Sequence, residues 1–146
     1  MILYLDTSAL VKLLVTEPES PIVAKLTEAA HTVATSQIAY VEACSALARR
    51  RRERLLDAET YLHARKTLAE HWLDLAAVEL DEIQSGDLTH KHDLRAFDAV
   101  HLAAALSLRK NAKHVAIQFC SFDERQRAAA ARENLIVLPV AGRSRR

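Results

Sequence analysis

Short apolar segments alternate with longer helical patterns along the whole chain, and this alternation constrains the fold more than any other feature. The five segments with the length and residue types of strands are residues 2–5, 32–35, 77–80, 114–119 and 135–138. Helical patterns lie between and beside them, at residues 8–15, 21–30, 37–54, 57–75, 81–86, 94–110 and 123–133. Strands joined by helical crossovers pair in parallel. The pattern therefore predicts an α/β fold with a central parallel sheet of about five short strands flanked by helices.

The length and composition indicate one soluble domain. The chain has 146 residues, of which only 2 are glycine and 3 are proline, and no linker or internal repeat is visible. No apolar run approaches the roughly 20 residues of a membrane-spanning helix, and the apolar start is too short for a secretory signal. We expect a single cytoplasmic domain over residues 1–146, without membrane attachment and with a flexible tail at residues 139–146.

Two acids, Asp6 and Asp123, each follow a predicted strand and precede a predicted helix. Ligands of open α/β sheets bind outside the carboxyl ends of the strands, so both acids lie where a site is expected. Each acid also has a simpler interpretation as the N-cap of the helix that follows it.

Two further acids, Glu42 and Asp98, interrupt the apolar faces of predicted helices. A buried carboxylate needs a positive partner, and Arg49 and Arg95 are near enough in sequence to serve. A divalent cation is the alternative, and it accounts for all four acids at once. Mg²⁺ or Mn²⁺ prefers oxygen ligands and activates water for phosphodiester hydrolysis, so the acids predict a metal-dependent hydrolase.

The strings that contain these acids carry a family resemblance. They are residues 3–13 (LYLDTSALVKL), 40–49 (YVEACSALAR, preceded by Ser36), 94–103 (LRAFDAVHLA) and 121–123 (SFD). In this order they resemble the PIN-domain ribonucleases, in particular the VapC-type toxins of bacterial and archaeal toxin–antitoxin pairs. The resemblance extends from residue 1 to about residue 138. One departure is Asp93, which stands where many family members have glycine and predicts a different turn or an extra charge near the site.

The resemblance implies a PIN-like fold and a Mg²⁺- or Mn²⁺-dependent endoribonuclease, which is a hydrolase. It implies that Asp6, Glu42, Asp98 and Asp123 are the catalytic and metal-binding acids, with Thr7, Ser8 and Ser121 as supporting residues. His101, one turn after Asp98, is expected to pack or to support the site. The partners that it implies are an RNA substrate and a cognate antitoxin protein, and we expect a homodimer. Apolar surface for self-association and for the antitoxin is predicted on the helices at 8–30 and 37–75.

The densest basic run follows Glu42 on the same predicted helix. It comprises Arg49, Arg50, Arg51 and Arg52, with Arg54 beyond them. Because the net charge of the chain is only +1, any attraction of RNA must come from such a local patch. The alternative is a solvated helix end whose cations interact favourably with the helix dipole.

Other functions fit the sequence less well. The histidines at residues 90 and 92 do not have the spacing of a zinc site. A phosphatase of the haloacid-dehalogenase type needs a second Asp two residues after the first, where this chain has Ser8. Two alternatives stay open: a PIN-fold RNA-processing nuclease without a toxin role, and a non-catalytic nucleic-acid-binding module.

Overall fold

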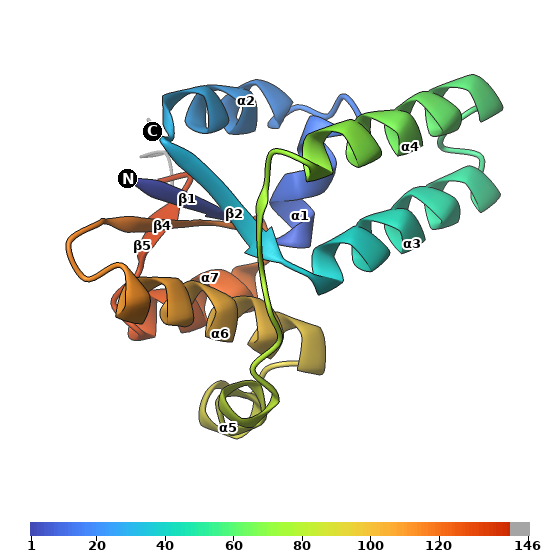
Figure 1. Ribbon diagram of the computed structural model, residues 1–146. Helices are drawn as coiled ribbons and strands as arrows, with labels where there is room; N and C mark the ends of the chain where they lie inside the picture. Colours follow the sequence, from blue (N-terminus) through green and yellow to red (C-terminus); the bar gives the residue numbers. More distant parts are fainter. Residues whose placement is uncertain (141–146) are drawn as a thin grey trace, which may run out of the picture.

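The computed structural model describes residues 1–140, in which five strands form one parallel sheet (Figure 1). The strands are β1 (Ile2–Leu5), β2 (Thr32–Ser36), β3 (Ala76–Val78), β4 (Ile117–Cys120) and β5 (Ile136–Leu138). Their order across the sheet is β3-β2-β1-β4-β5, and all four pairings are parallel. The predicted α/β fold is therefore confirmed. Most of the predicted tail, residues 141–146, lies outside the described residues.

Within residues 1–140, seven α-helices and one short 3₁₀ helix connect the strands. They are α1 (Thr7–Leu10), η1 (Val11–Leu13), α2 (Ser20–Ala29), α3 (Ile38–Arg52), α4 (Ala58–Trp72), α5 (Glu82–His92), α6 (Ala96–Asn111) and α7 (Glu124–Arg132). Within residues 1–140, none of these helices has the length and apolar character needed to cross a membrane.

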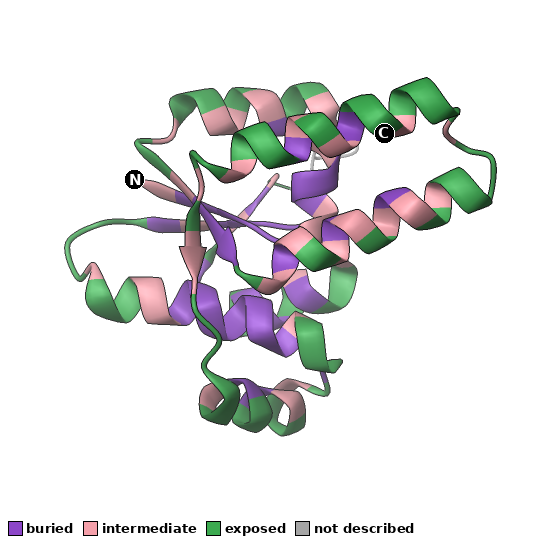
Figure 2. Ribbon diagram, turned by 45° about the vertical axis from the view of Figure 1, so that its right-hand side comes forward, coloured by how far each residue is buried: buried purple, intermediate pink, exposed green. Residues whose placement is uncertain are grey.

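Two helical layers cover the two faces of the sheet (Figure 1). Leu3 and Leu5 point into the core formed with η1, α2, α3 and α4. Tyr4 points to the opposite face, where it packs with Phe119 and the buried residues of α6 and α7. This alternation follows from the two-residue period of a strand. Helix α6 is buried over most of its length because α5 packs on its outer side (Figure 2).

Two helix predictions differ from the structure in extent. The predicted helix at 8–15 is one turn of α-helix followed by the 3₁₀ turn η1. The predicted helix at 81–86 extends to His92, because Leu88 is buried against the α6 core. A glycine in a helix weakens the helical pattern, but packing of the helix outweighs this local effect.

The strand order places a topological switch point between β1 and β4. The chain leaves β1 towards β2 on one side, whereas β4 and β5 extend the sheet on the other side. The register pairs Leu5 with Cys120, and the backbone N–H of Asp6 donates to the Cys120 carbonyl at 3.1 Å. Asp6 and Ser121 therefore leave the sheet side by side, at the crevice where open α/β sheets bind ligands.

Candidate active site

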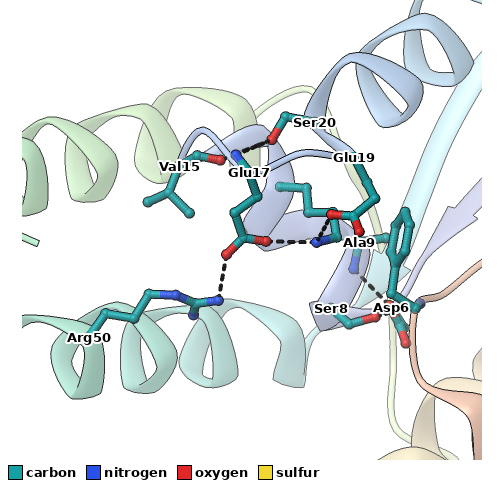
Figure 3. Close-up of polar contacts among 10 residues, drawn as sticks. Asp6, Ser8, Ala9, Val15, Glu17, Glu19, Ser20 and Arg50 are labelled. Atoms are coloured by element: carbon teal, nitrogen blue, oxygen red, sulfur yellow. Dashed lines mark hydrogen bonds and ion pairs between the residues drawn. The ribbon is translucent and has the colours of Figure 1, made fainter. Parts of the chain in front are cut away.

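Asp6 is the most buried acid of the predicted site, with an exposed fraction of 0 %. Its Oδ1 accepts hydrogen bonds from the Ser8 hydroxyl at 2.7 Å and from the Ala9 N–H at 2.9 Å (Figure 3). Its Oδ2 accepts one from the Ser121 hydroxyl. Asp6 is thus the N-cap of α1, as the simpler interpretation predicted, but its burial and its third hydrogen bond exceed what a cap requires.

Ser8 and Ser121 also hold together the two chain segments that leave β1 and β4. The Ser8 hydroxyl accepts a hydrogen bond from the N–H of Phe122 at 2.9 Å, and that of Ser121 accepts one from the N–H of Asp123 at 3.0 Å. Each serine donates to Asp6 and accepts from the backbone after β4. These bonds fix the carboxylate of Asp6 relative to the start of α7.

Glu42 lies on α3 and contacts two residues from other elements. Its Oε1 accepts hydrogen bonds from the Thr7 hydroxyl and from Nε2 of His101, each at 2.7 Å. The predicted alternative partner, Arg49, forms no ion pair within residues 1–140. Burial by itself would raise the pKa of Glu42, but the hydrogen bonds from His101 and Thr7 hold that pKa below its ordinary value.

His101 is buried on α6 and connects Glu42 to the sheet. Its Nδ1 lies 2.8 Å from the hydroxyl of Tyr4, and its Nε2 lies 3.0 Å from the Thr7 hydroxyl in addition to Glu42. A carboxylate only accepts hydrogen bonds, so Nε2 carries a proton, and Nδ1 makes its hydrogen bond with the Tyr4 hydroxyl. The supporting position expected for His101 agrees with these contacts.

Asp98 and Asp123 lie at the starts of α6 and α7, and Gln126 contacts both. The Gln126 side-chain amide donates to Oδ1 of Asp98, and its backbone N–H donates to Oδ1 of Asp123, both at 2.9 Å. Asp123 is the N-cap of α7. Asp98 is not ion-paired with Arg95 among the described residues.

Burial and charge repulsion raise the pKa values of two of the acids. Desolvation is the largest cause of the raised pKa of Asp6, and His101 and the Ser121 and Ser8 hydroxyls only partly oppose it. Desolvation also raises the pKa of Asp98, and the nearby carboxylate of Asp123 adds to the effect. Raised acid pKa values in a cleft are typical of functional sites.

The donor set suits a hydrated divalent cation. Glu42, Asp98 and Asp123 each accept their hydrogen bonds within residues 1–140 on one oxygen only. Beside Asp98, Oε1 of Gln126 is buried without a partner among the described residues. Over the same residues, no three His, Cys, Asp or Glu side chains form a ready-made cage for a metal ion. Mg²⁺ commonly binds through one or two carboxylates and keeps several waters, and this arrangement of acids matches that preference.

Sequence reasoning did not identify Tyr4 or Gln126. In the sequence, Tyr4 has the pattern of an ordinary strand residue, and Gln126 lies in a segment with the pattern of a polar helix. Each residue could have been found as a polar side chain at a position where its strand or helix is buried. Tyr4 points into the core, and Gln126 occurs three residues after Asp123 on the inner face of α7.

The arginines of the basic run on α3 differ in their contacts. Arg50 donates to Glu17 at 2.9 Å, and Glu17 also accepts from Lys12 at 2.7 Å (Figure 3). Arg51 donates weakly to the Leu56 carbonyl at 3.4 Å. Arg50 therefore joins α3 to the segment after η1, whereas Arg49 remains exposed on the helix surface.

The histidine-rich segment after Gly86 has a structural role. Lys91 and His92 both contact Oε1 of Glu133 at the end of α7, at 2.5 and 2.6 Å. Asp93 has φ 53° and ψ 48°, which is the left-handed conformation that favours glycine. The turn expected for a family member with glycine at this position is therefore retained here, and Asp93 caps α5.

Comparison with known proteins identifies the family. The family model described as PIN domain matches residues 3–132. In Mycobacterium tuberculosis (strain ATCC 25618 / H37Rv), Ribonuclease VapC49 is 36 % identical over 110 residues, which are 73 % of this chain and 76 % of that protein. Ribonuclease VapC46 of the same organism is 32 % identical over 136 residues, covering 93 % of this chain and 95 % of that one.

Solved structures share the fold. PAE2754 from Pyrobaculum aerophilum superposes with a TM-score of 0.66 at 16 % identity, covering 94 % of this chain and 92 % of that chain. A chain of VapBC2 from Rickettsia felis, solved bound to a DNA fragment from their promoter, superposes with a TM-score of 0.60 at 16 % identity, covering 94 % and 97 %. With the sequence matches over most of its length, the chain belongs to the PIN-domain family, in its VapC-type group.

Proposed function

We propose that this protein is an endoribonuclease that uses Mg²⁺ or Mn²⁺ to hydrolyse RNA phosphodiester bonds, and that it is the toxin of a toxin–antitoxin pair. One observation carries the enzymatic part. Asp6, Glu42, Asp98 and Asp123 come from four separate segments, yet all lie around the switch point between β1 and β4. Two VapC-type relatives named ribonucleases support the same reaction class.

The carboxylates of Asp6, Glu42, Asp98 and Asp123 are the groups that would hold the cation, directly or through its waters. When bound, the cation supplies an activated water and stabilises the charge on the phosphate. The partnerless oxygens of Glu42, Asp98 and Asp123 are suited to that task, while the fully hydrogen-bonded Asp6 anchors the centre of the site.

The remaining residues of the site position these acids. Thr7 and His101 both donate to Oε1 of Glu42 and so orient the carboxylate. Ser8 and Ser121 hold Asp6, and the hydroxyls of both serines are engaged in structural hydrogen bonds. A serine nucleophile is therefore not part of the proposal, which relies on water as the attacking group.

The enzymatic proposal is tested by cleavage of a panel of structured and single-stranded RNAs with Mg²⁺, with Mn²⁺ and with EDTA. Asp98→Asn is expected to lower the cleavage rate by at least about a hundredfold. Asp87→Asn, which changes an exposed acid on α5, is the matched control and should retain the wild-type rate. Cleavage that persists in EDTA, or in Asp98→Asn, would contradict the proposal.

The toxin role rests on the VapC-type relatives and on the fold shared with a chain of VapBC2. Expression of the wild type alone should arrest bacterial growth, and Asp98→Asn should not. Co-expression of the neighbouring gene product should restore growth and yield a complex. Wild-type expression without any growth defect would leave the alternative, an RNA-processing nuclease without a toxin role.

Self-association is the last part of the proposal. Exposed apolar side chains in the segment that joins α3 and α4, on α4 and just after α4 include Leu55, Leu62 and Leu73. A homodimer would cover part of this surface. Light scattering at micromolar concentration should give twice the chain mass of 16.3 kDa.

A further inference from the structure

A pocket of about 560 Å³ lies beside the candidate active site, between α3 and the start of α6. This volume is within the range of small-ligand sites. Its walls are mainly apolar and include Ile38, Val41, Ala46 and Phe97. Phe97 is 57 % exposed and Val41 is 69 % exposed, so both side chains are available to a ligand. We call this feature the α3–α6 pocket.

The α3–α6 pocket includes one acid of the candidate site, Glu42. Thr7 lines it as well, and Phe97 directly precedes Asp98 in the chain. Any group that occupies the pocket therefore lies next to the proposed catalytic centre. This position favours a part of the substrate that adjoins the reacting phosphate.

The pocket also contains a positively charged side chain on the same face of α3 as Glu42. This side chain is Arg49, which lines the pocket and lies two turns after Glu42, about 10 Å along α3. Unlike Arg50, which is paired with Glu17, Arg49 forms no ion pair within residues 1–140. An aromatic ring, aliphatic walls and one unpaired guanidinium are the groups that proteins use to bind a single RNA strand, by stacking on a base and contacting a phosphate.

We propose that the α3–α6 pocket binds a nucleobase of the RNA strand next to the phosphate that is cleaved. The base stacks on the ring of Phe97, its edges lie against the walls formed by Ile38 and Val41, and Arg49 binds a neighbouring phosphate. The proposal rests on the ribonuclease function proposed above and assigns one substrate contact to named residues; a base must be unstacked from a duplex before it can enter the pocket.

The binding test uses a short single-stranded RNA labelled with a fluorophore and the Asp98→Asn protein, in which cleavage is suppressed. Phe97→Ala is expected to weaken RNA binding about tenfold, since base–aromatic stacking contributes on this order. Phe97→Trp, which keeps a stacking face, should retain the affinity, and Phe97→Leu, which keeps only bulk, should not. Ile83→Ala removes another exposed apolar side chain, on α5, and serves as the control.

A second experiment tests whether Arg49 binds a phosphate of the RNA. Arg49→Gln should reduce the slope of log affinity against log salt concentration by about one, whereas Arg132→Gln, which changes an exposed arginine at the end of α7, should leave it unchanged. Equal affinity in Phe97→Ala and Phe97→Trp, or an unchanged slope in Arg49→Gln, would overturn the pocket assignment.

These two experiments also distinguish a failure of the pocket assignment from a failure of the ribonuclease function or of the predicted homodimer. If the wild type cleaves RNA with a metal ion and Phe97→Ala binds RNA normally, only the pocket assignment fails. If no RNA is cleaved under any metal condition, the ribonuclease function fails first. If Phe97→Ala lowers the mass measured by light scattering while its RNA affinity is unchanged, the pocket belongs to an interface between protein chains and the assignment is overturned.

Discussion

The hydrogen-bonded series Tyr4–His101–Glu42 sets the orientation of one candidate catalytic acid. Nε2 of His101 donates to Glu42, and Nδ1 lies 2.8 Å from the Tyr4 hydroxyl, so the ring is held by a hydrogen bond on each side. Burial is the largest cause that raises the pKa of Tyr4 well above its ordinary value, so the phenol keeps its proton at neutral pH. The hydroxyl of Tyr4 therefore helps to hold the ring in the orientation that donates to Glu42.

Tyr4→Phe removes this hydrogen bond without removing the packing. The new ring would keep its stacking against Phe119, which has a centroid separation of 5.4 Å in the wild type. We expect RNA cleavage to fall roughly tenfold, as is usual for groups that orient metal-site residues. Nitrogen NMR of His101 should show a shifted Nδ1 resonance, because that nitrogen loses its hydrogen-bond partner. Tyr61→Phe on α4 is the matched control, and wild-type cleavage by Tyr4→Phe would contradict the role of the series.

The raised pKa of Asp98 predicts a specific pH dependence of stability. An acid whose pKa is raised in the folded state contributes stability that is fully present below its ordinary value of 3.8 and is lost as pH rises through the folded-state pKa. Asn at this position still accepts the hydrogen bond from Gln126 but carries no charge. The melting temperature of metal-free Asp98→Asn should therefore exceed that of the wild type increasingly between pH 4 and pH 7.

Melting curves of both proteins across this pH range, beside those of Asp87→Asn, would measure the effect. The contribution of Glu42 to stability depends on pH with the opposite sign, because the pKa of Glu42 is lowered in spite of burial. Its contribution is present above its ordinary value of 4.5 and is lost as pH falls through the lowered pKa. A difference between Asp98→Asn and the wild type that does not vary with pH would show that Asp98 is not a strained acid.

Among the elements, the turn between α3 and α4 carries local backbone strain. Arg54 follows the end of α3 with φ 60°, a conformation that places its Cβ too close to the neighbouring carbonyl. Asp93 and Asn134 adopt similar angles, but their short polar side chains tolerate this region better. The helical hairpin of α3 and α4 therefore keeps an unfavourable residue at its tip.

Arg54→Gly should relieve this strain. We expect the free energy of unfolding to rise by about 1 kcal/mol, because glycine enters the left-handed region without a steric penalty. Asn134→Gly should change stability by only a few tenths of that amount or in the opposite direction, since asparagine already tolerates the region. Urea titrations of the three proteins would measure both changes. A less stable Arg54→Gly would mean that the arginine side chain contributes more than the backbone strain costs.

The whole molecule concentrates like charges at one point of the sheet. Four carboxylates surround the switch point, and the neighbouring basic groups Lys12 and Arg50 are engaged with Glu17. A divalent cation would relieve the repulsion between the carboxylates in the folded state alone, and a ligand that binds only the folded state stabilises it.

Mn²⁺ should therefore raise the melting temperature of the wild type. At a hundredfold excess over Kd the gain is about 2.7 kcal/mol, or roughly 8 °C for a chain of this length. Asp6→Asn, which changes the central acid, should melt with little dependence on Mn²⁺. Differential scanning calorimetry with Mn²⁺ and with EDTA measures both. An undiminished response in Asp6→Asn would remove Asp6 from the proposed metal site.

The order and type of the elements and the identity of the acids were readable from the sequence because they depend on local pattern. Apolar runs of strand length, and acids at the end of a strand or on the apolar face of a helix, are properties of neighbouring residues. For the same reason Asp6, Glu42, Asp98 and Asp123 were recognisable one by one. The extent of α5 was not, because Gly86 interrupts its local pattern and only packing against α6 sustains the helix.

The partners of those acids were decided by tertiary structure alone. His101 lies 59 residues from Glu42, and Gln126 lies 28 residues from Asp98. An arginine was the alternative partner considered for Glu42, whose carboxylate instead accepts from a histidine. Arg49 and Arg50 are adjacent in sequence, yet one is exposed beside a pocket and the other is held by Glu17. These contacts depend on strand order and on the register that sets Leu5 beside Cys120. That register results from packing across the whole core, which no local pattern encodes.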